Sequence, residues 1–245
     1  RNDSCWCGSG IKYKKCHIKE DEKLQELARQ GYAIPPITLI KTKEQIEGIR
    51  KSCALTKSLL DELDRIIKPG ITTNDINDWV HQETLNHGAI PAPLNYKGFP
   101  KSICTSINEV VCHGIPSDRV LKDGDIINVD ITCILNGYYG DSCRMYNVGQ
   151  VSKDVERLSE VTKESLYASI EAIKPYESIN NIGDAIERVV TPHGYGIVEM
   201  FGGHGIGNEF HEDPFVYHYS KKQKLMICVP GMVFTIEPMI NLGTY

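Results

Sequence analysis

The chain has 245 residues, of which 41% are hydrophobic and 24% charged, and its net charge is −5. This length suits one large mixed domain with a small appendage, and the modest charge does not indicate nucleic acid or an anionic membrane as the main partner. No apolar run approaches the roughly 18 residues of a membrane span. The nine cysteines are scattered and odd in number, which favours metal-bound or buried thiols over a disulfide framework. We therefore expect a cytoplasmic protein that does not bind membranes.

Residues 1–20 predict a small metal-binding module. Its three thiols and one imidazole fall within thirteen residues and match a closed tetrahedral zinc site: Cys5, Cys7, Cys16 and His17. So short a segment cannot bury a core, so the metal must supply its folding free energy. Four lysines between positions 12 and 19 indicate either an acidic or RNA-rich docking surface or a solvated face. The segment resembles the SEC-C zinc knuckle of translocation- and translation-associated proteins, which implies one structural zinc.

Residues 21–40 are expected to form a charged helix and a linker. The next predicted helix runs from Thr42 to Lys68, where apolar residues recur at helical spacing until Pro69-Gly70. Another helix is expected from about Asn74 to His87. Together they open a large domain that spans residues 41–245.

These two helices recur in the second half of the chain. The pattern Ile67-Lys-Pro…His87-Gly88 realigns with Ile173-Lys-Pro…His193-Gly194 at a constant offset of 106 residues. A further helix is expected from Lys153 to Ile173, and a β-prone run extends from Met232 to Ile240. We therefore predict an α+β, pseudo-two-fold sandwich of two helix–helix–hairpin halves, with sheets forming the site and helices behind them.

The stretch from Ile126 to Met145 predicts a hairpin with Asn136-Gly137 as its loop. That loop pairs Thr132 with Asp141 and makes Asp130 and Asp141 diagonal neighbours on one face, roughly 7–8 Å apart. Two carboxylates at this reach suit a pair of divalent metals about 3.5–4 Å apart. The alternative is that they are solvated surface acids. The opposite face carries an apolar stripe that must be covered, formed by Ile127, Val129, Ile131, Cys133 and Leu135.

Further candidates for the same site lie elsewhere in the sequence. His113 follows a strand-like run, and His204 and His211 lie in a glycine-rich stretch that matches neither a phosphate-binding loop nor an H-E-x-x-H motif. Under the internal repeat, Glu237 lies beside the position equivalent to Asp130. A lone histidine is most often an ordinary surface or core residue, but one imidazole among several carboxylates suits Mn, Fe, Co or Zn.

From Lys41 to Tyr245 the chain resembles the type I methionine aminopeptidases, whose fold is known as pita-bread. The motifs that carry the resemblance are Ser106-Ile-Asn-Glu-Val-Val-Cys-His113-Gly-Ile-Pro, Asp130…Asp141, Gly203-His204-Gly-Ile-Gly and Phe234-Thr-Ile-Glu237-Pro-Met. The resemblance implies four metal ligands, namely Asp130, Asp141, His204 and Glu237. It implies His113 and His211 as catalytic histidines that do not bind metal. It implies a pocket for the methionine side chain lined by Tyr96, Phe99, Cys104 and Phe210, with Phe99 standing where a tyrosine is common.

The implied reaction removes the initiator methionine from nascent polypeptides. Hydroxide generated with the help of two divalent ions (Co, Mn, Fe or Zn) attacks the first peptide bond. Glu237 shuttles the proton, His211 stabilises the oxyanion and His113 binds the scissile amide. The protein is expected to be a monomer, with the knuckle contacting the ribosome or the translation and translocation machinery.

Two rival functions use the same fold. Prolidases and Xaa-Pro aminopeptidases usually carry a large amino-terminal domain, whereas only residues 1–40 precede the catalytic region here. The second rival is a binding module of the same fold that has lost its metals, although the four ligand residues are intact in this sequence. The strand carrying Glu237 is expected to lack a partner before Tyr245, so we also predict that the polypeptide continues and holds a fifth metal ligand beyond Tyr245.

Overall fold

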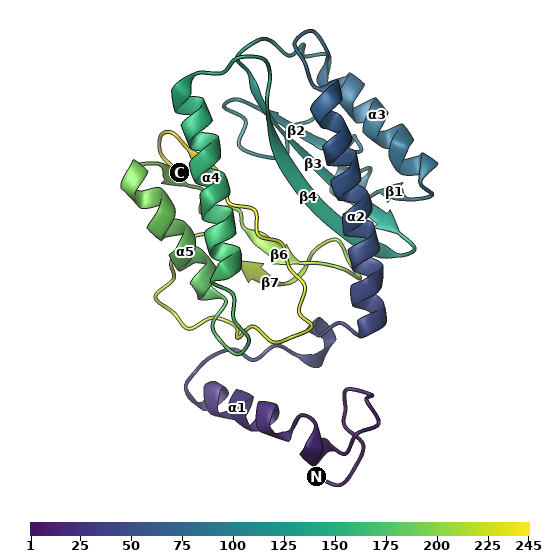
Figure 1. Ribbon diagram of the computed structural model, residues 1–245, viewed down its shortest axis with the longest axis vertical. Coiled ribbons are helices and arrows are strands. Elements are labelled where there is room, and N and C mark those ends of the chain that lie inside the picture. The colour runs from purple at the N-terminus through teal and green to yellow at the C-terminus, as the bar shows by residue number, and fades with distance from the viewer.

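The computed structural model describes residues 1–245 and shows two halves side by side, with a small N-terminal module at one end (Figure 1). The first half contains α2 (Lys43–Ile66), α3 (Thr73–Asn86), β1 (Ile90–Pro91), β2 (Cys104–Ile107), β3 (Ile126–Leu135) and β4 (Tyr138–Asn147). The second contains α4 (Lys153–Glu171), α5 (Asn180–Val190), β5 (Gly196–Ile197), β6 (Gly203–Gly205), β7 (Glu212–Val216) and β8 (Ile240–Asn241). The helix pair α4–α5 repeats α2–α3, so the predicted α+β class and two related halves are confirmed. None of the helices combines the length and hydrophobicity that crossing a bilayer requires.

The hairpin β3–β4 has the predicted register. Thr132 lies opposite Asp141, and Asp130 lies opposite Cys143 on the same strand pair. Asn136 and Gly137 both have positive φ, 52° and 83°, as a two-residue turn of this kind requires. The two acids therefore lie on one face of the sheet.

Helix α2 covers the other face of this hairpin. The helix begins with a capping box between Thr42 and Gln45. Its buried hydroxyls hold the sheet: Ser52 Oγ donates to Cys133 O at 2.8 Å and Thr56 Oγ1 donates to Gly140 O at 2.7 Å. The apolar stripe of β3 is buried in a core cluster of 16 residues up to Cys133, and Leu135 is partly buried against this cluster. The face that carries the acids is therefore the one left to form a site.

The second half has a smaller core of 8 buried residues and shorter strands. Here the prediction of a strand across the run from Met232 to Ile240 is only partly right. Phe234 bridges β6, and Ile240–Asn241 pairs with β5, but Pro238 lies between them and has no N–H for a ladder. The segment carrying Glu237 does have a neighbour, because Thr235 N donates to His204 O at 2.8 Å. This neighbour is the upstream strand β6 and not the second hairpin strand expected after Glu237, so that expectation stays a prediction.

The strand-like run before His113 is also shorter than predicted. Strand β2 ends at Ile107, because Asn108 has a left-handed φ of 52° and turns the chain away. His113 itself has a φ of 55° and lies in a loop.

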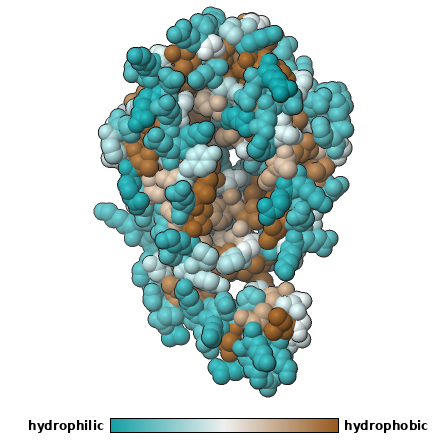
Figure 2. Space-filling view, in the orientation of Figure 1, coloured by the Kyte–Doolittle hydropathy of each residue, from teal (hydrophilic) through white to brown (hydrophobic).

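The N-terminal module consists of a short 3-10 turn (Tyr13–Lys15) and α1 (Ile18–Arg29). The linker that follows is held to the second half by backbone hydrogen bonds. Ile227 N donates to Ala33 O at 2.9 Å, and Lys41 N donates to Gly231 O at 2.8 Å. Hydrophilic side chains cover the flanks of the molecule, while apolar ones gather along the middle of one face, between the halves (Figure 2).

Candidate active site and metal centres

Four of the predicted ligands meet between the two halves; we call them the acid cluster. Asp130 comes from β3, Asp141 from β4, His204 from β6 and Glu237 from the segment after Phe234. His204 Nε2 lies 3.6 Å from Asp141 Oδ2 and 3.6 Å from Glu237 Oε1. No lysine or arginine pairs with any of the three carboxylates, so their negative charge has no fixed counter-charge except the imidazole.

The electrostatics of the acid cluster show this excess of negative charge. Burial, followed by the charges of Asp141 and Glu237, raises the pKa of Asp130 well above its ordinary value. Burial and the charge of Asp141 likewise raise the pKa of Glu237 to about 7. Carboxylates that repel one another in a partly buried space are stabilised by a bound cation.

The neighbours of His204 orient it as a ligand. Its Nδ1 is 2.9 Å from Gly205 O, so Nδ1 donates there, and Nε2, which faces the carboxylates, can bind a cation once it loses its proton. Thr235 Oγ1 accepts from His204 N at 3.0 Å and donates to Glu237 Oε1 at 2.6 Å. Outer hydrogen bonds of this kind fix metal ligands in place. The donor set therefore fits divalent cations.

An aromatic group adjoins the acid cluster. The ring centroids of His204 and His211 are 4.1 Å apart, and Tyr96 packs on both Phe210 and His211. Tyr96 Oη lies 2.9 Å from His211 Nδ1. Burial, followed by the charge of His204, lowers the pKa of His211 to about 4, so this imidazole is neutral. In the tautomer whose Nδ1 accepts from the tyrosine hydroxyl, Nε2 carries the proton and can act as a donor.

The remaining predicted residues differ in how closely they approach the acid cluster and the aromatic group. Cys104 on β2 lies directly opposite Asp130 on β3, which places it beside the acid cluster. His113 packs edge-on against Phe201, with ring centroids 5.3 Å apart. Phe99 is half-buried after a turn that contains Tyr96, and no aromatic contact joins it to the group around Phe210.

Sequence reasoning missed three polar residues beside the site. His218 is fully buried, its Nε2 accepts from Glu237 N at 3.2 Å, and burial lowers its pKa to about 4. Lys41 forms a buried ion pair with Glu212, the residue after His211. Glu212 could have been noticed from its place in the glycine-rich stretch, whereas Lys41 carries no signal in the sequence that separates it from other lysines.

The N-terminal cysteines and histidine form a second, tighter cluster. The ligand atoms of Cys5, Cys7, Cys16 and His17 all lie within 4.8 Å of one another. The donors of the acid cluster are spread more widely. Cys7 Sγ and Cys16 Sγ are 3.6 Å apart, well beyond the roughly 2.05 Å of a disulfide. The set is therefore suited to a closed tetrahedral ion rather than to a cross-link.

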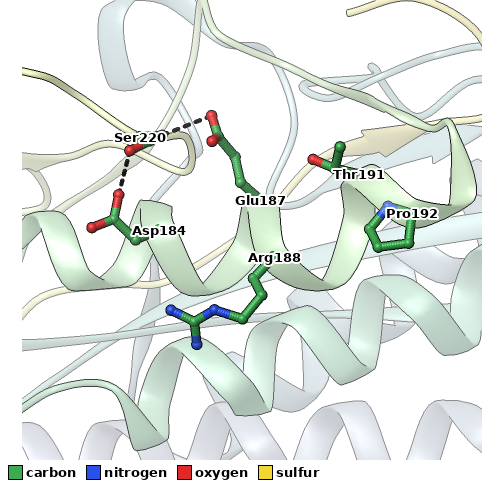
Figure 3. Close-up of a pocket in the computed structure, with 6 residues that line it drawn as sticks. All are labelled: Asp184, Glu187, Arg188, Thr191, Pro192 and Ser220. Carbon is green, nitrogen blue, oxygen red and sulfur yellow. Dashed lines mark hydrogen bonds between the residues drawn. The ribbon is translucent and has the colours of Figure 1, made fainter.

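The polar hollow on α5, of about 490 Å³, is not part of this site (Figure 3). Asp184 and Glu187 both turn toward Ser220, and Ser220 N donates to Glu187 Oε1 at 2.9 Å. None of the predicted site residues lines it. These bonds tie the chain after β7 to α5.

Comparison with known proteins agrees with the fold. Residues 47–245 match metallopeptidase family M24, and residues 1–19 match the SEC-C motif. The chain therefore belongs to metallopeptidase family M24, with a SEC-C motif at its N-terminus.

Several relatives are named methionine aminopeptidases. A methionine aminopeptidase of Chlamydia trachomatis is 48% identical, covering 99% of this chain and 84% of the relative. Methionine aminopeptidase A of Synechocystis is 52% identical, covering 85% and 83%. The crystal structure of the enzyme from Rickettsia prowazekii superposes with a TM-score of 0.82 at 47% identity, covering 84% and 83%. The predicted family and its pita-bread fold are thus confirmed, and the chain is a metallopeptidase.

The likeness to proline-directed enzymes is one of fold alone. An Xaa-Pro dipeptidase from Bacillus anthracis superposes with a TM-score of 0.70, but it is only 23% identical and the match covers 54% of that chain.

Proposed function

We propose that this protein removes N-terminal methionine from nascent polypeptides, with Asp130, Asp141, His204 and Glu237 holding two divalent ions. The observation that carries the proposal is the acid cluster, in which three carboxylates and one imidazole converge without a lysine or arginine. Relatives about half identical over most of their length, all named methionine aminopeptidases, support the choice of substrate.

The bound ions, of Co, Mn, Fe or Zn, would lower the pKa of water so that hydroxide is available near neutral pH. The side chain of Glu237 is 31% exposed, against 13% for that of Asp141, so it can exchange a proton with the reacting groups. His211 donates from Nε2 to the oxyanion that develops at the first peptide carbonyl. His113 hydrogen-bonds the scissile amide.

The substrate side chain is proposed to lie against the aromatic group. Tyr96, Phe99, Phe210 and Cys104 offer rings and a thiol, and a flexible thioether packs favourably on such surfaces. Tyr96 also contacts His211, and by donating its hydroxyl to Nδ1 it would favour the tautomer with the proton on Nε2.

The N-terminal module is proposed to bind one structural zinc through Cys5, Cys7, Cys16 and His17. We infer that its lysines contact an acidic or RNA-rich surface of the ribosome or of the translation or translocation machinery. The enzyme is proposed to act there as a monomer, in the cytoplasm.

Peptide competition tests the substrate assignment. The chain would be loaded with Mn, Co, Fe or Zn in turn and given Met-Ala-Ser, Met-Pro-Ser and Ala-Pro-Ser. Release of methionine from Met-Ala-Ser, lost on chelation and restored by metal, is the expected result. Preferential cleavage before proline would favour an Xaa-Pro peptidase. No cleavage by any metal-loaded form would favour a binding module.

A further inference from the structure

We infer that Lys41 is a positioning residue for catalysis, because its ion pair with Glu212 fixes the loop that presents Phe210 and His211. The inference rests on the proposed function, which places both aromatic residues against the substrate. Neither Lys41 nor Glu212 belongs to the acid cluster.

The ion pair is buried. The side chain of Lys41 is 2% exposed and that of Glu212 is 11% exposed. Lys41 is shielded from water and Glu212 is only partly exposed, so the lysine needs the carboxylate as its partner. Burial alone would raise the pKa of Glu212, but the hydrogen bond from Lys41 and two backbone N–H groups lower it.

The carboxylate of Glu212 holds the loop 207–211 by accepting several hydrogen bonds. One of its oxygens, Oε1, accepts from Asn208 N at 2.8 Å and from Glu209 N at 2.9 Å. The other oxygen accepts from Lys41 Nζ. The two backbone groups immediately before Phe210 are thus held by a carboxylate whose own position depends on Lys41.

Lys41 is itself fixed at the start of α2. Its backbone N–H donates to Gly231 O at 2.8 Å, and the capping box of α2 begins at the next residue. The loop packs directly on this part of the helix. A Cβ on Gly207 would lie 2.4 Å from Ile49 Cδ1 and 3.4 Å from Lys41 Cε. The loop 207–211 is therefore supported by its packing against the N-terminal part of α2.

The test compares Lys41→Met with Lys41→Arg, and uses Lys43→Met as a matched control on an exposed lysine two residues away. Removing the charge should lower kcat by about 100-fold, the cost of misplacing a catalytic group by about 1 Å. Lys41→Arg should recover most of the rate, and Lys43→Met should leave it unchanged. The imidazole NMR signals of His211 in the metal-free protein should shift in Lys41→Met and stay in place in Lys43→Met.

A double-mutant cycle separates positioning from general damage to the fold. If Lys41 acts through His211, Lys41→Met should cost almost nothing further in a His211→Ala background. An equal loss in both backgrounds, or unmoved His211 signals in Lys41→Met, would overturn the inference. If Lys41→Met fails to fold, Glu212→Gln keeps the shape and removes the charge, and the same outcomes apply. If the wild type releases no methionine, the proposed function fails, while the His211 signals still decide whether Lys41 fixes the loop.

Discussion

Each carboxylate of the acid cluster is repelled by the negative charge of the other two. The fold maintains this arrangement because Asp130 and Asp141 are set by the hairpin register and Glu237 by hydrogen bonds to Thr235 and His218. Binding of a cation to the folded state should therefore stabilise it.

Asp141→Asn tests this at a single residue. In the wild type, metal at about 100 times its Kd should add about 2.7 kcal/mol to the free energy of unfolding, seen as a rise in Tm. The variant should lose most of this rise and nearly all turnover, since it removes ligand charge from a site rather than from the core. Asp154→Asn on the exposed start of α4 is the control and should behave as the wild type. Wild-type methionine release in Asp141→Asn would contradict the metallopeptidase site.

Gly140 shows how closely α2 approaches the strand that carries Asp141. A Cβ on Gly140 would lie 2.3 Å from Cys53 N and 2.4 Å from Ser52 C, which are backbone atoms and cannot move aside like a side chain. Gly140→Ala should therefore lower the free energy of unfolding by about 3 kcal/mol in a denaturant titration. A Cβ on Gly243 would have nothing within 4 Å, so Gly243→Ala should be neutral. A neutral Gly140→Ala would show that the helix can be displaced without cost.

At the level of elements, the hairpin could be predicted because its determinants are local. Asn136-Gly137 sets the turn, and the alternation along β3 then fixes which side chains share a face. The same reasoning could not place β2 on the other edge of β3, because that pairing depends on a long loop. The core helices were predictable for a similar reason, since Thr42 and Pro69-Gly70 mark where α2 begins and ends.

Contacts between distant segments were not predictable. Lys41 and Glu212 are 171 residues apart, and nothing local in either segment indicates the other. The interruption at Pro238 could have been read from the sequence, because proline cannot donate to a ladder, but hydrophobic β-prone neighbours on both sides obscured it.

The N-terminal module should be separable from the peptidase site. Its thiolate-rich donors are soft and close together, so it should retain zinc against a mild chelator that strips the carboxylate-rich centre. Cys16→Ser should lose the bound zinc, measured by elemental analysis. Deleting residues 1–20 should leave tripeptide cleavage nearly intact. A large loss of activity on a tripeptide would instead make the module part of the active site.

Across the whole molecule, the two halves have unequal cores, of 16 and 8 buried residues. Opening of the second half should therefore require less free energy than opening of the first. Amide hydrogen exchange is expected to be slowest along β3 and faster in β5 and β8, which are two-residue strands. Equal protection of β3 and β8 would show that the two halves open only together.

The linker hydrogen bonds at Ala33 and Lys41 have a consequence for encounters with large particles. A flexible tether would let the zinc module hold a surface while the catalytic region explored many orientations around it. Here the linker is hydrogen-bonded to residues 226–231, so the module keeps a fixed orientation relative to the acid cluster. When the module binds a surface, the direction from which a substrate N-terminus can reach the acid cluster is therefore fixed. Binding of the module then raises the local concentration only of those substrates whose N-termini approach from that direction.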